Sequence, residues 1–449
     1  MSYEPTDEVR VRPRGWSRRV VGGLGCAAGL LVLVVAGLAL AGGGPVSQPV
    51  RLANGETVTL EAVTVGTQPY VSGTPWQRVL HGLLPGSLKQ RSGARTYQAS
   101  DPRMVTFWVR RASVASPGQP ASLQAMPFDE HGCTGPLVFG QGLGESLERY
   151  ELRALPRRGE RVGLRFGRTV DPSRPDSKWE VLGEISTPNP IPRPLPVWPP
   201  TRTPVTGTAD RLSVQMLELK AGVDPGELNL NPGPEMVYWS ARYRIFEDGK
   251  PTRAWSGSPS EMEDATGNQW YSGSVGYSEE PDVRVLHFTN PRWRDESSLK
   301  VGFSLYRTPE ARFTPAETWS VKRIPIPTGD SVVTLGRSAT VNGLPLGLVA
   351  IYGPQAKLPQ NLPFGGGEGQ VRLVMRGAGA PPPLCMEMVR RATDNTGREV
   401  RLQNTAMTSN GQERQMLYRV DAPAGATHFD LEYVVHYGKK VEMTVPITR

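Results

Sequence analysis

Apolar and polar residues alternate with a period of two over much of the chain after residue 49. Residues 429–435 show the pattern most clearly, because four apolar side chains would lie on one face of a strand and Asp430 and Glu432 on the other. Residues 239–245 repeat it. Strands that bury one face and expose the other are typical of antiparallel sheets, so the pattern predicts an all-β fold.

Turn signals separate these alternating stretches. Four dipeptides accept the positive φ that tight hairpin turns demand, namely Asn54-Gly55, Asp248-Gly249, Asn342-Gly343 and Asn410-Gly411. Helical patterns are few. Residues 76–84 are expected to form a short amphipathic helix, and residues 145–150 a single helical turn.

The same order of features recurs three times along the chain. Each repeat opens with an alternating stretch, continues with a second strand and then carries an Asp-x-x-Gly sequence. The openings are residues 58–65, 212–219 and 338–352, and the second strands are residues 104–110, 236–246 and 371–375. The Asp-x-x-Gly sequences are Asp129/Gly132, Asp264/Gly267 and Asp394/Gly397, spaced 135 and 130 residues apart. We interpret this order as triplication of one antiparallel β-sandwich domain, resembling the immunoglobulin-like architecture in shape.

Each repeat is also predicted to end in a pair of adjacent strands. The pairs are residues 162–166 with 179–185, residues 301–306 with 319–326, and residues 429–435 with 441–447. The predicted domains are therefore residues 49–187, 207–328 and 329–449. Residues 188–206 between the first two are rich in proline, which fixes φ and donates no N–H, so this linker is expected to be an extended spacer.

Residues 20–41 predict a transmembrane helix. They hold twenty-two residues without a charge, enough for a helix of roughly 33 Å across a hydrocarbon core of about 30 Å. Five arginines precede them, which favours a cytoplasmic tail at residues 1–19 and an extracytoplasmic remainder of the chain. The expected location is the cell membrane, with a single pass.

Two alternatives stay open for this segment. Ala41 ends a small-residue sequence that fits a cleavable export signal, although the apolar run is longer than the usual 7 to 15 residues of a signal core, which favours an uncleaved signal-anchor. Gly25 and Gly29 have the GxxxG spacing that lets two membrane helices approach closely, so a homodimer through this helix is a second hypothesis.

The charge of the chain does not indicate a nucleic-acid partner. The formal net charge is +8, and 42 of the 51 basic residues are arginine, but they stand singly along the chain. Nucleic-acid binding needs a clustered basic face or a known binding module, and the sequence beyond the N-terminus has neither.

No local motif indicates catalysis, a metal or a cofactor. The five histidines have no HExxH spacing, there is no CxxC pair, and no GxSxG sequence is present. The densest polar cluster is Asp129, Glu130, His131 and Cys133, which we interpret as a type I turn because the Asp and Gly recur in the other repeats. We therefore expect a non-catalytic protein. A hydrolase with a site assembled across loops stays open as an alternative.

The two cysteines outside the apolar segment fall in different repeats. Cys133 and Cys385 therefore cannot form a disulfide within one domain, and a bridge between domains stays open beside the favoured interpretation as core thiols.

Tryptophan is unevenly distributed and supplies the only candidate binding residues. The second repeat holds five of the ten tryptophans, and the third holds none. Trp255, Trp270 and Trp293 lie in loop-like stretches beside Gly, Ser, Asn and Pro, where a flat ring can contact a protein or glycan partner. The alternative is that these rings fold over the ends of the sandwich.

The opening of the first repeat reads RLANGETVTLEAVTVG and is followed by TPWQRVLHGLLPG. Over about residues 15–190 the chain resembles a family of bacterial membrane-anchored proteins that occurs in large paralogous sets and has no known activity. The resemblance implies an exported bacterial protein and no particular chemistry.

The sequence as a whole predicts a membrane-anchored extracytoplasmic module of the bacterial cell envelope that is structural or binds a ligand. Two alternatives stay beside it, an envelope hydrolase and a purely structural assembly component.

Overall fold

The computed structural model describes most of the chain beyond residue 45. The described ranges are residues 46–99, 101–112, 123–144, 146–169, 179–199, 201–222, 237–270, 273–280, 283–290, 296–359, 369–409 and 412–448. The predicted membrane segment at residues 20–41, with Gly25 and Gly29, lies outside them, as does Trp293. In the described ranges, no helix combines the length and the apolar character that crossing a membrane requires.

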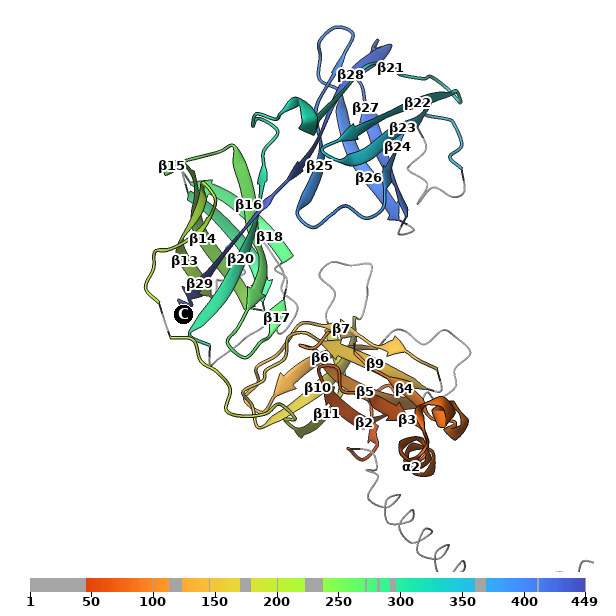
Figure 1. Cartoon of the computed structure of the whole chain (residues 1–449), viewed down its shortest axis with the longest axis vertical. Coiled ribbons are helices and arrows are strands. Elements are labelled where there is room, and N and C mark those ends of the chain that lie inside the picture. Colours follow the sequence, from red (N-terminus) through yellow and green to blue (C-terminus); the bar gives the residue numbers. More distant parts are fainter. Residues whose placement is uncertain are drawn as a thin grey trace, which may run out of the picture. The chain divides into compact units, whose positions relative to one another are not determined.

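The chain forms two compact units, residues 1–193 and residues 194–449 (Figure 1). Their described parts are all-β, with antiparallel sheets throughout, as predicted. The boundary between the units falls inside the predicted proline-rich linker.

The first unit contains two sheets that pack face to face, which we call the first sandwich. Across this core the rings of Tyr150 and Phe166 meet edge to face, with centroids 5.8 Å apart. One sheet has the spatial order β1 (Val50–Arg51), β2 (Thr57–Val65), β5 (Val105–Ala112), β9 (Leu147–Leu152), β8 (Gln141–Gly142). The other has the order β11 (Trp179–Pro188), β10 (Arg161–Thr169), β6 (Gln124–Asp129), β7 (Val138–Phe139).

The predicted helix at residues 76–84 is confirmed as α2 (Pro75–Leu83). Thr74 caps it: the Thr74 side chain accepts from the backbone N–H of Gln77, and the Gln77 side chain accepts from the backbone N–H of Thr74. The helix lies beside the 3₁₀ helix η1 (Gly86–Ser92) and the two-stranded sheet of β3 (Tyr70–Ser72) and β4 (Arg95–Tyr97).

The predicted helical turn at residues 145–150 is wrong. Residues 147–152 form strand β9, which pairs with β5 and β8. Leu147, Tyr150 and Leu152 are all buried in the core, so the burial of these side chains on a paired strand outweighs the local helical pattern.

The second sandwich lies in the second unit. Its two sheets meet through Tyr243 and Phe303, whose ring centroids are 5.0 Å apart. One sheet has the order β12 (Val205–Ala209), β13 (Leu212–Ala221), β14 (Val237–Glu247), β19 (Val283–Asn290), β18 (Gly273–Glu280), with β15 (Lys250–Pro251) beside β14. The other has the order β17 (Gln269–Trp270), β16 (Trp255–Glu263), β20 (Ser298–Arg307), β29 (Lys439–Pro446).

The third sandwich completes the second unit. Phe429, Leu431, Tyr433 and Val435 all point into its core, as the period of two predicts. One sheet has the order β22 (Val332–Val341), β23 (Leu344–Tyr352), β24 (Val371–Ala378), β27 (Glu413–Asp421), β26 (Arg401–Ser409). The other has the order β21 (Thr318–Pro325), β28 (His428–Tyr437), β25 (Cys385–Asp394), and the 3₁₀ helix η3 (Pro315–Glu317) precedes β21.

The predicted strand pairs at the ends of the repeats are confirmed only in the first sandwich, where β10 pairs with β11. In the second unit both predicted pairs are wrong. β20 pairs with β29, and β21 pairs with β28 (Figure 1). Residues 318–325 therefore pair with a strand of the third sandwich, and residues 439–446 with a strand of the second.

The reason is the length of one connection. A single residue, Gly438, separates β28 from β29, whereas a tight hairpin needs a loop of at least two residues. β29 therefore cannot fold back on β28, and the chain runs on into the sheet of the second sandwich.

Candidate functional site

The structure places two of the three predicted binding tryptophans, Trp255 and Trp270, inside the second sandwich. Trp255 is 7% exposed at the start of β16, and Trp270 is 6% exposed on β17. Trp270 pairs with Met262, seven residues along β16 from Trp255, so the backbone positions of the two tryptophans lie about 23 Å apart along the sheet at about 3.3 Å per residue. The two rings therefore form no shared exposed platform, and Trp293 lies outside the described residues.

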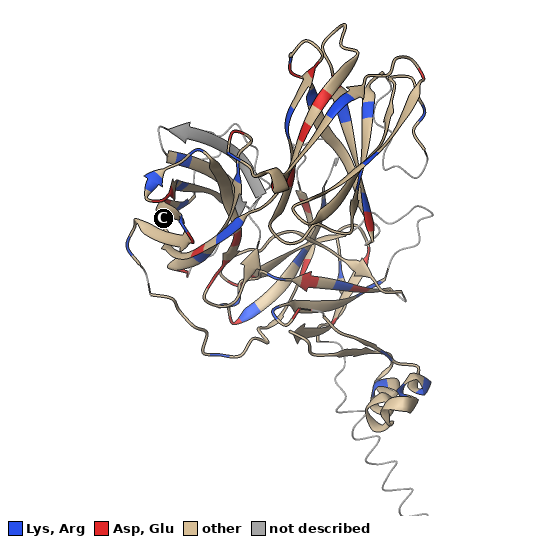
Figure 2. Cartoon of the chain, turned by 45° about the horizontal axis from the view of Figure 1, so that its top comes forward, with Lys and Arg blue, Asp and Glu red and all other residues tan. Residues whose placement is uncertain are grey.

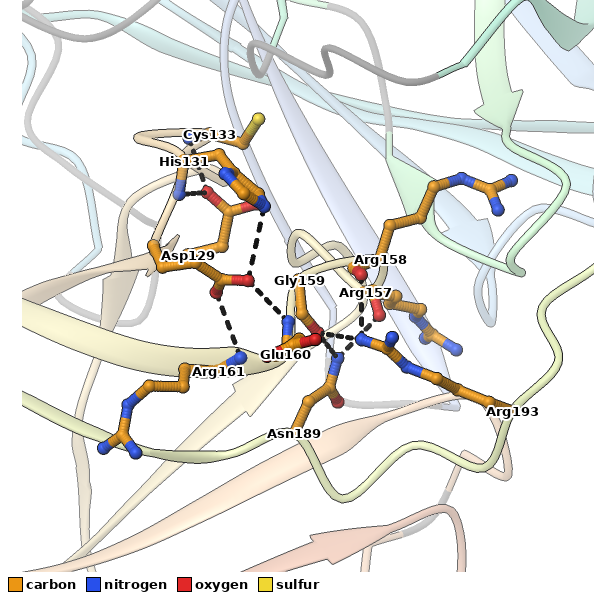
Figure 3. Close-up of polar contacts among 11 residues, drawn as sticks. Asp129, His131, Cys133, Arg157, Arg158, Gly159, Glu160, Arg161, Asn189 and Arg193 are labelled. Carbon is orange, nitrogen blue, oxygen red and sulfur yellow. Dashed lines mark hydrogen bonds and ion pairs between the residues drawn. The ribbon is translucent and has the colours of Figure 1, made fainter.

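The three Asp-x-x-Gly sequences form the same turn, as predicted. In the first, one carboxylate oxygen of Asp129 accepts from the backbone N–H groups of His131 (3.0 Å) and Cys133 (2.8 Å), and Gly132 has a φ of 75° (Figure 3). Asp264 and Asp394 accept from the residues two and four positions on in the same way, at 2.8 to 3.0 Å. The recurring aspartates therefore stabilise hairpins.

The polar side chains around Asp129 also form hydrogen bonds with backbone groups of neighbouring loops (Figure 3). The Glu130 carboxylate accepts from the backbone N–H groups of Glu160 (2.6 Å) and Arg161 (3.0 Å). The Asn189 amide and the Arg193 guanidinium donate to backbone carbonyls of residues 157–159. The polar side chains of this cluster are thus used to hold the loop between β9 and β10.

The pKa values of the two acids follow from these contacts. Burial raises the pKa of Asp129 above its ordinary value, against its N–H donors. For Glu130 burial acts in the same direction, but the backbone N–H groups of Glu130, Glu160 and Arg161 outweigh it and lower the pKa. Within the described residues there is no group of three or more His, Cys, Asp or Glu side chains arranged to hold a metal ion. Neither Cys133, which is buried, nor Cys385, which is half-buried, forms a disulfide.

A pocket of about 650 Å³ lies where the second and third sandwiches are joined, and we call it the junction pocket. It includes Trp255, so one of the predicted residues does border a cavity. Its walls come from the β12–β13 turn, the end of β14, the start of β16, the end of β20 with the segment after it, and the two sides of Gly438. The lining residues are Ala209, Asp210, Arg211, Leu212, Glu247, Ala254, Trp255, Arg307, Glu310, Ala311, Arg312, Tyr437 and Lys439.

Arg307 organises this pocket. Its guanidinium forms an ion pair with Glu317 and donates to the carbonyl oxygen of Arg312 at 2.9 Å. The same group lies 5.7 Å from the centroid of the Trp255 ring and 5.0 Å from that of Phe313, which are cation–π distances. Burial opposes ionisation of Glu317, but the N–H of Thr314 and the charge of Arg307 outweigh it and lower its pKa.

The third sandwich contributes Arg390 to the same junction. Its guanidinium lies 5.5 Å from the Phe313 centroid, forms an ion pair with Glu432 at 2.6 Å and donates to the carbonyl oxygen of Pro309 at 3.1 Å. Phe313 therefore contacts a cation from each sandwich. These contacts hold the segment between β20 and β21 in place and with it one wall of the junction pocket.

Several side chains at the mouth of the pocket are accessible. Tyr437 is 39% exposed, and Arg312 and Glu310 are exposed with no ion-pair partner among the described residues. Lys439 pairs with Asp210 at 2.7 Å, a pair in which both side chains are about half exposed or more. The pocket thus presents an aromatic ring beside charges of both signs.

A second cavity, of about 760 Å³, lies on the third sandwich between strands β25 and β26. Both are outermost strands of their sheets. Its walls carry Arg390, Arg391, Arg401 and Arg419 with Glu399 and Asp421. Arg419 is bidentate to Asp421, and charged side chains along edge strands commonly protect them from aggregation, so this groove has a structural explanation.

Charges elsewhere on the described surface are mixed. Figure 2 shows basic and acidic positions interspersed along the strands of each unit. Many of them pair across neighbouring strands, as Arg110 does with Glu61 and Lys300 with Glu442.

Sequence reasoning identified Trp255 and missed the rest of the junction pocket. Arg307 and Phe313 are only six residues apart, but Arg390 comes from a distant strand and meets them only through the strand pairing of the second unit, and no local motif marks the three. Comparison with models of known protein families and with curated proteins found no match to this chain.

Proposed function

We propose that this protein is a non-catalytic binding module of the bacterial cell envelope, anchored by residues 20–41 and built from three copies of an immunoglobulin-like domain. The resemblance of residues 15–190 to bacterial membrane-anchored proteins and the uncharged apolar segment support the location. The repeated strand order and the repeated aspartate turns support the triplication.

The junction pocket carries the binding proposal. Ligand sites occur preferentially where domains meet, and this pocket gathers five separate segments at such a place. The other dense polar cluster, around Asp129, uses its side chains to hold its own loops. Trp255 and Tyr437 supply apolar surface, while the exposed Arg312 and Glu310 are available to a ligand.

The lining favours a ligand that carries both charges and an apolar face. Four cations border the pocket, Arg211, Arg307, Arg312 and Lys439, against three acids, Asp210, Glu247 and Glu310. Such a lining complements an amphoteric molecule, and a sugar ring or a peptide fits the aromatic wall. Glycopeptide fragments of the bacterial cell wall combine these properties and are the ligand class that we propose.

The experiment titrates soluble muropeptides into the full-length chain in detergent and follows binding by calorimetry. Tyr437→Ala and Arg312→Ala are each expected to weaken binding about tenfold, the equivalent of roughly 1.4 kcal/mol. Tyr352→Ala, which changes a half-buried tyrosine that lines neither cavity, is the control and is expected to bind like the wild type. Unchanged muropeptide affinity in the Tyr437→Ala and Arg312→Ala variants, or no binding by the wild type, would contradict the proposal.

A purely structural role is the second candidate, and the reciprocal strand pairing of the second unit favours it. The chain passes between the two sandwiches twice, at residues 308–317 and at Gly438. Two connections restrict the relative motion of the two sandwiches more than one does, which suits a stiff spacer. This role predicts a protein complex captured by crosslinking in native membranes, and it predicts that Tyr437→Ala and Arg312→Ala leave the complex intact.

A further inference from the structure

The second and third sandwiches exchange their last strands. In the first sandwich the last strand, β11, follows β10 in the chain and pairs with it. In the second unit β21 follows β20 in the chain but pairs with β28, and β29 follows β28 but pairs with β20 (Figure 1). Each sandwich therefore holds, in the place that β11 occupies in the first, the strand that the other would have used.

Strand β29 is fully integrated into the second sandwich. It pairs with β20 over eight residue pairs, from Leu305 opposite Lys439 to Ser298 opposite Pro446. Val441 and Val445 are completely buried. Beyond the strand, the backbone N–H of Thr448 donates to the carbonyl of Leu219 at 2.8 Å, so the end of the chain reaches the opposite sheet.

Charged side chains fix the position of β29 as well. Lys440 pairs with Glu261 of β16 at 2.6 Å, Glu442 pairs with Lys300 of β20 at 2.9 Å, and Lys439 pairs with Asp210 at 2.7 Å. The second sandwich thus has a specific acceptor groove for one strand, and the donor of that strand is the last segment of the third sandwich.

The covalent link between acceptor and donor is a single ten-residue segment outside β29 and the strand that it pairs with. After β20, the chain joins the second sandwich to the block formed by the third sandwich and β29 only through residues 308–317. That segment contains Pro309 and Pro315, which fix φ and limit how the chain folds back. A block attached in this way makes the same strand contacts with any copy of the second sandwich.

We propose that β29 is accepted by the second sandwich of a second copy of this chain, giving a strand-exchanged dimer in which residues 308–317 act as the hinge. Exchange of an identical element between copies keeps every contact of β29 with its sheet, so the two arrangements differ in the contacts and conformation of residues 308–317 and in the entropy of association. The partner is chemically specified: a groove with Glu261, Lys300 and Asp210 at its rim accepts the strand that carries Lys440, Glu442 and Lys439.

A pair of cysteines tests this directly. Ser304 and Lys440 are directly opposite each other on β20 and β29. Full-length chains carrying Ser304→Cys with one tag and Lys440→Cys with another are co-expressed and oxidised. A disulfide between these two positions is expected in a species of twice the monomer mass, identified by mass spectrometry of the linked peptides.

Two control experiments make the outcome decisive. A single chain with both Ser304→Cys and Lys440→Cys shows that the variants fold and that the pair can be bridged. Chains with Ser320→Cys and with Glu432→Cys are mixed in the same way; these residues are opposite each other on β21 and β28, which stay in one chain in both arrangements. Monomers alone from the first mixture, or linked dimers from both mixtures, would overturn the proposal, whatever contacts the membrane segments make.

Discussion

Gly438 lies directly against the backbone carbonyl of Leu305: a Cβ atom at position 438 would be 2.5 Å from that oxygen and 2.7 to 2.8 Å from the ring of Tyr306. Real Cβ contacts are not this short, so only glycine fits where the chain crosses from the third sandwich to the second. At this crossing the chain passes from β28 of the third sandwich to β29 of the second, and the residues on both sides of Gly438 line the junction pocket.

Gly438→Ala is expected to destabilise the second unit by about 1–3 kcal/mol, the usual cost of forcing extra volume into a packed site. The measurement is hydrogen–deuterium exchange of peptides covering β20 and β29, which should lose protection. Gly347→Ala on β23 is the control, because its nearest neighbour would be an ordinary 3.6 Å from the new Cβ atom. Equal effects of the two substitutions would argue against a tight crossing at Gly438.

His436 makes the same junction sensitive to acid. Its side chain is completely buried, with the rings of Phe313 and Tyr306 5.5 and 6.2 Å away. Burial, followed by the charge of Arg307, lowers the pKa of His436 below its ordinary value of 6.5, and the nearby Glu317 only partly opposes this. As the pH falls below 6.5, the unfolded chain therefore binds a proton at His436 more readily than the folded chain does. The stability that depends on neutral His436 is complete above pH 6.5 and is lost as the pH falls below it, by at most about 1.4 kcal/mol per pH unit.

The measurement follows exchange protection of β28 between pH 5.5 and 7.5, after correction for the intrinsic exchange rate. The wild type is expected to lose protection toward pH 5.5, and His436→Phe should flatten the profile because the imidazole is gone. His428→Gln, at the other end of the same strand, is the control and should keep the wild-type profile. A profile that His436→Phe leaves unchanged would rule out this histidine as the cause.

Asp264 is the most buried residue of the three turn aspartates. Its carboxylate accepts from the backbone N–H and hydroxyl of Thr266 and from the backbone N–H and amide of Asn268, at 2.6 to 3.0 Å, and it is 1% exposed. Asp264→Ala leaves buried donors without an acceptor and is expected to cost roughly 1–3 kcal/mol. Thermal unfolding of the full-length chain measures this, with the exposed Asp330→Ala as control. An unchanged midpoint for Asp264→Ala would show that water replaces the carboxylate.

Sequence patterns predicted the local features of this fold. They failed where the burial of a side chain or the partner of a strand depends on segments that are distant in the chain. The Asp-x-x-Gly turns need only neighbouring residues, and so does α2, where Thr74 and Gln77 cap each other. Trp255 and Trp270 look like loop residues because Gly, Ser and Asn surround them, yet pairing of β16 with β17 and β20 buries both.

The strand exchange is non-local in the same way. Phe429 to Val435 and the residues after Gly438 each show the period of a strand, and alternation says nothing about which neighbour a strand pairs with. The predicted strands left residues 436–440 between them, long enough for a hairpin, whereas in the structure the strands extend to Tyr437 and from Lys439 and leave one residue, which excludes a hairpin. The junction pocket could not be predicted, because its walls meet only once β29 has left the third sandwich.

Ending the chain after Gly438 distinguishes the exchanged arrangement from three independent domains. If each domain used its own last strand, the deletion would damage the third sandwich. In the exchanged arrangement it removes Val441, Met443 and Val445 from the core of the second, at roughly 1.5–3 kcal/mol for each buried side chain, while β21 still completes the third.

Limited proteolysis of the shortened full-length protein is therefore expected to cut within β13 to β20 and to spare residues 318–437. A synthetic peptide of residues 439–449 should restore protection, because the acceptor groove is intact and the lysines and Glu442 of the peptide regain their partners. A peptide with Lys440→Glu is the control, since it places like charges beside Glu261 and should restore less. Cleavage confined to the third sandwich would show that β29 belongs there in solution.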